Sequence, residues 1–110
     1  MSNQFQIIYS PAALDDLRSI YIYIAEELFA PQAASNTINR IRTDIRKLDQ
    51  FPEKHTQVDW EPWASMGMRF MPVKNYDVYY LVDKENATVT VVRVFYGGRD
   101  VEHIIRDGLE

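Results

Sequence analysis

Three apolar runs in the second half of the chain constrain the fold most, because very short turns separate them. The runs span residues 68–73, 76–82 and 88–96, and the turns between them are 74–75 and 83–86. Parallel neighbours would need a crossover of about a dozen residues, so we expect an antiparallel three-strand meander. The run 88–96 is apolar at nearly every position, which predicts a central strand with both faces covered.

A helical period precedes these strands. Between residues 12 and 28, apolar side chains recur at spacings of three and four, which predicts one buried stripe: Leu14, Leu17, Tyr21, Ile24 and Leu28. Ser10 suits the N-cap of this helix and Pro11 its first position. After Ala30-Pro31 a second stripe runs to residue 52: Ala34, Ile38, Ile41, Ile45 and Leu48. Two such helices with almost no connection indicate an antiparallel hairpin.

The remaining segments complete the expected order. Residues 5–9 read as a first strand, 52–66 as a loop without periodicity, and 100–107 as a short terminal helix after Gly97-Gly98. We therefore expect an α+β fold of order β-α-α-β-β-β-(α), with the helical hairpin packed on a small antiparallel sheet. A length of 110 residues fits a single domain, 1–110.

Composition excludes several classes of protein. The chain has no cysteine, which rules out a disulfide scaffold, a thiolate metal site and a cysteine nucleophile. It lacks both the run of about 18 apolar residues that spans a membrane and the start of a signal peptide, so we expect a cytoplasmic protein without a membrane partner. The net charge of −4 disfavours general nucleic-acid binding, leaving only a local basic patch for such a role.

Few residues suit acid–base chemistry. His55 and His103 are the only histidines, and neither has metal-ligand spacing to another donor, so we expect no metal and no other cofactor. His55 reads as a solvated loop residue. His103 lies near Arg99 and Asp100, just past the expected central strand, where a loop on a rigid scaffold often carries function.

Three arginines interrupt or follow apolar strands. Arg69 and Arg93 should each reach a carboxylate, the solvent or a ligand, because an unpaired buried guanidinium costs several kcal/mol. If Arg69 faces the groove opposite the helices, it points at whatever binds there. Arg99 could either grip a phosphate or carboxylate of a partner, or form a salt bridge within the C-terminal segment, to Asp100, Glu102 or Asp107.

Two tryptophans in the expected loop allow two interpretations. Trp60 and Trp63 either cover an edge of the core or stack on a base or a partner. The tyrosines of the strands are more often core residues than chemical groups.

Four segments together resemble the RelE/ParE superfamily of toxins from bacterial type II toxin–antitoxin systems. They are IIYSPAALDDLRSIYIYI at residues 7–24, LDQFP at 48–52, MRFMPVKNYDVYYLVD at 68–83 and TVVRVFYGGRD at 90–100. The resemblance covers nearly the whole chain in the right order, except mainly for residues 53–66.

The resemblance implies a growth-inhibiting toxin that a cognate antitoxin neutralises in a hetero-oligomer. One branch of the superfamily cleaves mRNA on the ribosome without a metal, and another poisons DNA gyrase without nuclease activity. Arg99 matches the family's basic residue after the last strand, His103 lies near a terminal Tyr or His, and Arg69 matches an arginine of the ParE-like branch. These three would be catalytic in a ribonuclease, whereas Arg99, Arg69 and Asp100 would contact the target in a binding-only toxin.

Departures from the nuclease pattern favour the ParE-like branch. Met68, Phe70 and Asp77 stand near positions where RelE nucleases carry basic residues, and the overall charge is acidic. We therefore expect a toxin directed at DNA gyrase. A RelE-like endoribonuclease that acts on ribosome-bound mRNA is the first alternative, and a non-toxic protein-interaction module is the second.

Overall fold

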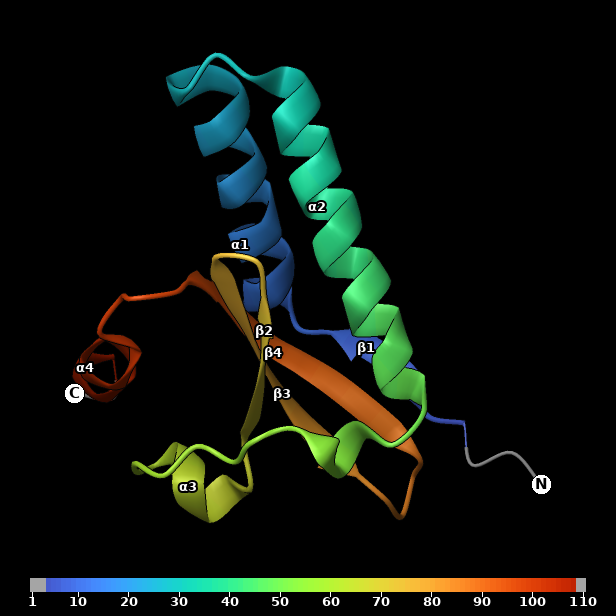
Figure 1. Cartoon of the computed structure of the whole chain (residues 1–110). Helices are drawn as coiled ribbons and strands as arrows, with labels where there is room; N and C mark the ends of the chain where they lie inside the picture. Colours follow the sequence, from blue (N-terminus) through green and yellow to red (C-terminus); the bar gives the residue numbers. More distant parts are fainter. Residues whose placement is uncertain (1–3, 109–110) are drawn as a thin grey trace.

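The computed structural model describes residues 4–108 (Figure 1). Its larger elements are β1 (Gln6–Tyr9), α1 (Pro11–Ile22), α2 (Pro31–Arg46), β2 (Arg69–Val73), β3 (Tyr76–Asp83), β4 (Thr88–Tyr96) and α4 (Val101–Asp107). Short turns complete the order: the π-turn η1 (Tyr23–Glu27), the 3-10 turns η2 (Lys47–Asp49) and η3 (Pro52–Lys54), and α3 (Trp63–Met66). The predicted α+β class and element order are confirmed.

The sheet has the strand order β1-β4-β3-β2, so the predicted central position of the last strand is confirmed. Strands β2, β3 and β4 form the expected antiparallel meander. The sheet as a whole is mixed, because β1 pairs parallel to β4 from Gln6 opposite Thr88 to Tyr9 opposite Val91. The helical hairpin lies between β1 and the meander in the chain and supplies the long connection that a parallel neighbour needs.

Helix α1 begins as predicted. The Ser10 hydroxyl accepts a hydrogen bond from the Ala13 amide at 3.0 Å and donates one to the Val92 carbonyl at 2.8 Å. This cap ties the start of α1 to β4, so it fixes the position of the helix on the sheet as well as satisfying an orphan amide.

The predicted stripe of α1 is partly wrong. Leu17 and Ile24 are buried, but Leu14, Tyr21 and Leu28 remain 41%, 39% and 54% exposed. The buried face is instead centred on Ala13 and Leu17, because the small Ala13 side chain allows the helix to approach the sheet closely. The stripe of α2 is confirmed, with Ile38 partly buried and the other four side chains buried: Ala34, Ile41, Ile45 and Leu48.

The first helix also ends earlier than residue 28. After Ile22 the backbone widens into the π-turn η1, and Phe29 adopts a left-handed conformation with φ 53°. The Leu28 amide then donates to the Tyr23 carbonyl and the Ala30 amide to the Ile24 carbonyl, which turns the chain into α2. Figure 1 shows the resulting hairpin extending well past the sheet.

Two apolar clusters lie on the two sides of the sheet. The first lies under the helices and contains Leu17, Ile41, Ile45, Val78 and Tyr80 among its buried members. The second lies on the far side, where α3 and α4 pack, and contains Trp63, Met68, Tyr79, Phe95 and Val101. Trp60 stacks on Trp63 with ring centres 5.0 Å apart, so the structure assigns both tryptophans to covering the core.

None of the helices in residues 4–108 has the length and apolar content needed to cross a membrane.

Candidate functional site

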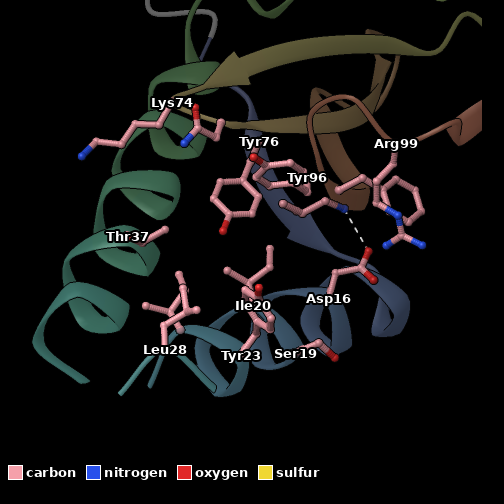
Figure 2. Close-up of a pocket in the computed structure, with 14 residues that line it drawn as sticks. Asp16, Ser19, Ile20, Tyr23, Leu28, Thr37, Lys74, Tyr76, Tyr96 and Arg99 are labelled. Atoms are coloured by element: carbon pink, nitrogen blue, oxygen red, sulfur yellow. Dashed lines mark hydrogen bonds between the residues drawn. The ribbon is translucent and has the colours of Figure 1, made fainter. Parts of the chain in front are cut away.

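A groove of about 750 Å³ separates the helical hairpin from one end of the sheet (Figure 2). Its hairpin wall comes from α1, η1 and Thr37 of α2, and its sheet wall from the β2–β3 turn and the end of β4. Apolar and aromatic side chains dominate this lining: Ile20, Tyr23, Ile24, Leu28, Tyr76, Val94, Phe95 and Tyr96. Such a lining suits the apolar side chains of a bound segment.

An ion pair between α1 and β4 joins the two walls of the groove. The carboxylate of Asp16 accepts hydrogen bonds from Arg93 at 2.7 and 3.0 Å and from the Val94 amide at 2.9 Å, the last drawn dashed in Figure 2. The two side chains are only 14% and 28% exposed. Arg93 therefore reaches a carboxylate, one of the three partners that the sequence allowed, and its guanidinium also lies 4.4 Å from the ring centre of Phe95.

Tyrosine rings form the polar part of the lining. Tyr76 and Tyr96 meet edge to face with ring centres 5.6 Å apart. Burial raises the pKa of Tyr76, and the neighbouring hydroxyls of Tyr96 and Tyr23 raise that pKa further. Tyr76 therefore keeps its proton at neutral pH, and the groove offers it as a neutral hydroxyl that can donate a hydrogen bond.

Two cations border this groove. Lys74 lies in the β2–β3 turn and Arg99 follows β4, and both residues are exposed. Within residues 4–108 neither of them forms an ion pair, in contrast to Arg93. The groove is thus apolar and aromatic inside and has two available positive charges on its lining, which favours a partner with matching acidic side chains.

Arg99 lies where the sequence predicts it, on an exposed turn after Gly98, whose φ is 95°. The predicted alternative of a salt bridge within the C-terminal segment is wrong. Glu102 pairs with Arg106 at 2.8 Å, and Asp107 lies 3.0 Å from His103. The guanidinium of Arg99 instead lies 5.3 Å from the Phe95 ring centre, and no side chain within residues 4–108 pairs with it.

Asp100 and His103 are close to Arg99 in the chain but lie outside the groove lining. Asp100 caps α4, because its carboxylate accepts a hydrogen bond from the His103 amide at 3.2 Å. The imidazole of His103 is exposed and contacts Asp107 one turn further along the same helix. These two residues therefore have local roles at the start of α4.

Arg69 is at the other end of the meander. It pairs in register with Tyr80, whereas the groove is next to Tyr76, about 13 Å further along the strand at the usual rise per residue. Its side chain lies on the same side of the sheet as the helices, together with Tyr80 and Met71. Arg69 therefore does not face a groove on the opposite side of the sheet, which was the arrangement in which it would point at a bound partner. Its guanidinium donates to the His55 carbonyl at 2.6 Å and so anchors the 52–66 segment.

His55 differs from the solvated loop residue that we expected, because it is partly buried beside Tyr80. Burial lowers the pKa of its imidazole, and the positive charges of Lys54 and Arg69 lower that pKa further. In residues 4–108 no three side chains of the types that ligate metals gather into one cluster.

Sequence patterns alone miss most of the groove. They assign Tyr76 and Tyr96 to the core, leave Tyr23 off the buried stripe of the first helix, and assign Lys74 only to a turn. The available signal is positional: Tyr76 and Tyr96 are the first residue of β3 and the last of β4, so they pair at the sheet end nearest Arg99.

Comparisons with known proteins agree with this architecture. The family described as "ParE toxin of type II toxin-antitoxin system, parDE" matches residues 7–101. No curated protein matches.

Among solved structures, a chain of the chromosomal ParDE system of P. aeruginosa is 18% identical with a TM-score of 0.70, covering 87% of this chain and 99% of that one. A mutant of the E. coli toxin RelE in the free state is 12% identical with a TM-score of 0.64 and 92% coverage of both chains. A chain of the RelBE2 toxin–antitoxin complex of Mycobacterium tuberculosis is 18% identical with a TM-score of 0.58, covering 84% and 98%. These likenesses show a shared fold.

The family match spans nearly all of β1 through the start of α4, including both walls of the groove. The chain belongs to the ParE toxin family of type II toxin–antitoxin systems.

Proposed function

We propose that this toxin arrests growth by binding DNA gyrase, without cleaving RNA, and that a cognate antitoxin neutralises it by occupying the groove. The family assignment makes the chain a toxin, and DNA gyrase as its target is the part that we add. It rests on which chemical groups the groove contains and on the charge of the chain.

The observation that carries the proposal is that the groove lining, within residues 4–108, has no group suited to accept a proton at neutral pH. Metal-independent RNA cleavage needs a general base for the ribose hydroxyl, a general acid and cations for the phosphorane. Arg99 and Lys74 could serve as cations, but Tyr76 has a raised pKa and Asp16 is bound to Arg93 and Val94. Both histidines are absent from the lining.

The three residues expected to be catalytic in a ribonuclease are also dispersed. Arg69 anchors the 52–66 segment, His103 contacts Asp107, and only Arg99 lines the groove. A binding-only toxin requires no such convergence. The net charge of −4 likewise suits a protein target better than ribosomal RNA.

Arg99 is our candidate for target contact. Its guanidinium is exposed, stacked on Phe95 and without an ion pair in residues 4–108, so it can grip a carboxylate or phosphate bidentately. The other two candidates already have partners within the chain. Arg69 donates a hydrogen bond to the His55 carbonyl, and Asp100 accepts one from the His103 amide. We expect them to affect the target indirectly, through the 52–66 segment and α4.

The groove supports binding of an antitoxin segment with apolar residues on one face. The solved RelBE2 and ParDE structures are described as toxin–antitoxin systems or complexes. In the present chain, acidic residues flanking the apolar ones would meet Lys74 and Arg99. An antitoxin bound there covers Arg99, which gives a direct mechanism of neutralisation.

Two assays on the purified protein test the choice of target. We expect inhibition of gyrase-catalysed DNA supercoiling and, in a coupled translation reaction, intact transcripts. Cut transcripts with normal supercoiling would replace the proposal with the RelE-like ribonuclease. Absence of both effects, together with normal growth on induced expression, would favour the non-toxic interaction module.

Replacing Arg99 tests its role. Arg99→Ala should abolish growth arrest while leaving the melting temperature near that of the wild type, because the side chain is exposed and makes no ion pair within residues 4–108. Arg106→Ala is the matched control, since it removes an exposed arginine whose partner lies within α4. An Arg99→Ala protein that still arrests growth fully would remove Arg99 from the proposal.

A thermal-shift titration tests the antitoxin. Binding to the folded state alone stabilises by mass action, by about 2.7 kcal/mol at a ligand concentration one hundred times Kd. The product of a short neighbouring gene should therefore raise the melting temperature in a concentration-dependent way. No shift at saturating concentration would contradict a groove-binding antitoxin from that gene.

A further inference from the structure

The outer end of the hairpin carries exposed apolar side chains that extend beyond the groove lining. We define the hairpin tip by four side chains that are 44%, 55%, 54% and 87% exposed: Ile22, Tyr23, Leu28 and Phe29. Figure 1 shows this end projecting past the sheet, where no other element of residues 4–108 covers it. Large apolar side chains that are exposed together at one end of a small protein are typical of an interaction site.

The backbone of the hairpin tip is arranged to present these side chains. A regular α-helix ends at Ile22, and the π-turn η1 widens the next turn. Phe29 then adopts φ 53°, a left-handed conformation that disfavours residues with a Cβ. A bulky side chain in this conformation lowers the stability of the fold. Because Phe29 is 87% exposed, burial of its ring offsets little of this loss.

Phe51 shows that backbone and exposure alone are not sufficient grounds for a site. It also has a left-handed φ, 52°, and is 79% exposed, at the opposite end of α2. However, its neighbours in the chain are the polar Gln50 and the buried Pro52, so no exposed apolar residue adjoins it in the sequence. Phe29 differs because three more exposed apolar side chains accompany it.

The charge of the hairpin tip is one-sided. Residues 19–39 contain Glu26 and Glu27, both exposed, and not a single Lys, Arg or His. The groove has the opposite character, with Lys74 and Arg99 on its lining. Glu26 and Glu27 therefore favour contact with basic side chains, whereas Lys74 and Arg99 favour contact with acidic groups.

We propose that the hairpin tip inserts into an apolar pocket on the DNA-binding surface of the target enzyme, with Phe29 as the central anchor. This inference rests on the proposed function, because an enzyme that handles DNA carries basic side chains for the phosphates. Those side chains would rim the pocket and attract Glu26 and Glu27. The toxin then contacts its target at two points, the hairpin tip and Arg99.

The arrangement also explains how an antitoxin in the groove would prevent both contacts. Tyr23 and Leu28 belong to the hairpin tip and also line the groove. An antitoxin segment that fills the groove covers these two side chains and Arg99 while leaving Phe29 outside. Substitution of Phe29 therefore separates target binding from antitoxin binding.

The test compares Phe29→Asn with Phe51→Asn in a gyrase supercoiling assay and in a thermal-shift titration with the antitoxin. Asparagine tolerates the left-handed conformation, so neither variant should lose folding stability. We expect Phe29→Asn to weaken inhibition about tenfold or more, as for an interface anchor, and Phe51→Asn to change it less than about twofold. Antitoxin binding should stay unchanged in both.

Full inhibition by Phe29→Asn, with wild-type inhibition intact, would overturn the inference and leave the proposed function standing. Loss of antitoxin binding without loss of inhibition would also overturn it, because the hairpin tip would then serve the antitoxin. Failure of the wild-type toxin to inhibit gyrase would overturn the proposed function and this inference together.

The acidic rim gives an independent measurement. The double variant Glu26→Gln/Glu27→Gln should weaken gyrase inhibition at low salt, and the difference from wild type should shrink as ionic strength rises. Asp59→Asn/Glu85→Gln removes two exposed charges elsewhere and serves as the control. A loss of inhibition that is equal in both double variants would contradict a basic-rimmed pocket, because it would reflect net charge alone.

Discussion

The inner half of the hairpin lies on the sheet, whereas the outer half extends beyond it, and the two halves treat large apolar residues differently. The inner half buries Leu17, Ile41 and Ile45 and is tied to β4 through Asp16 and Arg93. The outer half leaves most of its large side chains exposed, with Ile24 as its main buried one. We infer that the inner half determines stability and that the outer half is available for recognition.

A helical period alone does not separate these two roles. Apolar side chains at spacings of three and four indicate a helix face that something covers, but not whether the cover is the sheet, the second helix or another molecule. Here the sheet ends before the hairpin does (Figure 1). Substitutions in the inner half should therefore lower stability most, whereas substitutions in the outer half should lower binding of partners most.

The largest loss of folding stability is expected from Ile41→Ala in the inner half. Ile41 is 1% exposed, and truncation of a buried isoleucine removes apolar contacts and leaves a cavity. The free energy of unfolding should fall by about 2–5 kcal/mol, measured by urea denaturation. A loss below about 1 kcal/mol would mean that the inner half does not hold the core.

An alkaline titration tests the same core through Tyr80. Burial raises the pKa of Tyr80 to about 12 from the usual 10.0, so its neutral form stabilises the fold fully below pH 10. This contribution, about 3 kcal/mol for two pKa units, should be lost between pH 10 and 12. Tyr79, whose pKa burial also raises to about 12, adds a similar loss.

The variant Tyr80→Phe isolates one of these two contributions. Its stability should fall less steeply than that of the wild type between pH 10 and 12, and the variant also loses the hydrogen bond from Tyr80 to the Pro52 carbonyl at 2.6 Å. Melting temperatures across the pH range provide the measurement. An unchanged alkaline slope would show that Tyr80 does not titrate in this range.

The sheet and the start of the hairpin are more predictable from sequence than the outer half. The Ser10-Pro11 start, the α2 stripe and the meander with its central last strand follow from local rules of capping, period and turn length, and the structure confirms them. The parallel pairing of β1 with β4 does not follow from such rules, because it depends on where the hairpin returns the chain in space. The shifted stripe of α1 depends on the close approach that Ala13 permits.

The candidate site is predictable only in part. Arg99 can be found from sequence because it follows a strand at a glycine turn, a local signal. The pairing of Arg93 with Asp16 joins residues 77 positions apart, and the groove joins α1 to the β2–β3 turn, so neither can be located from spacing. The π-turn before Phe29 leaves no periodic signal, and the predicted helix therefore continues through it.

A smaller loss of stability is expected when two neighbouring aspartates of α1 are compared. Asp16→Asn should lower the free energy of unfolding by about 2 kcal/mol, because it weakens a largely buried, bidentate contact with Arg93. Asp15→Asn, whose pair with Arg18 is 69–72% exposed, should change it by less than about 0.5 kcal/mol. Equal losses in the two variants would show that helix position on β4 does not depend on Asp16.

The smallest effect on stability is expected from Leu28→Ala in the outer half. Leu28 is 54% exposed, so truncation returns little apolar area to water and should cost less than about 0.5 kcal/mol. Because Leu28 lines the groove and also belongs to the hairpin tip, the same change should weaken both gyrase inhibition and antitoxin binding. Urea denaturation, the supercoiling assay and the thermal-shift titration measure the three quantities on one protein. Loss of stability comparable to that of Ile41→Ala would abolish the distinction between the halves, since the outer half would then belong to the folded core.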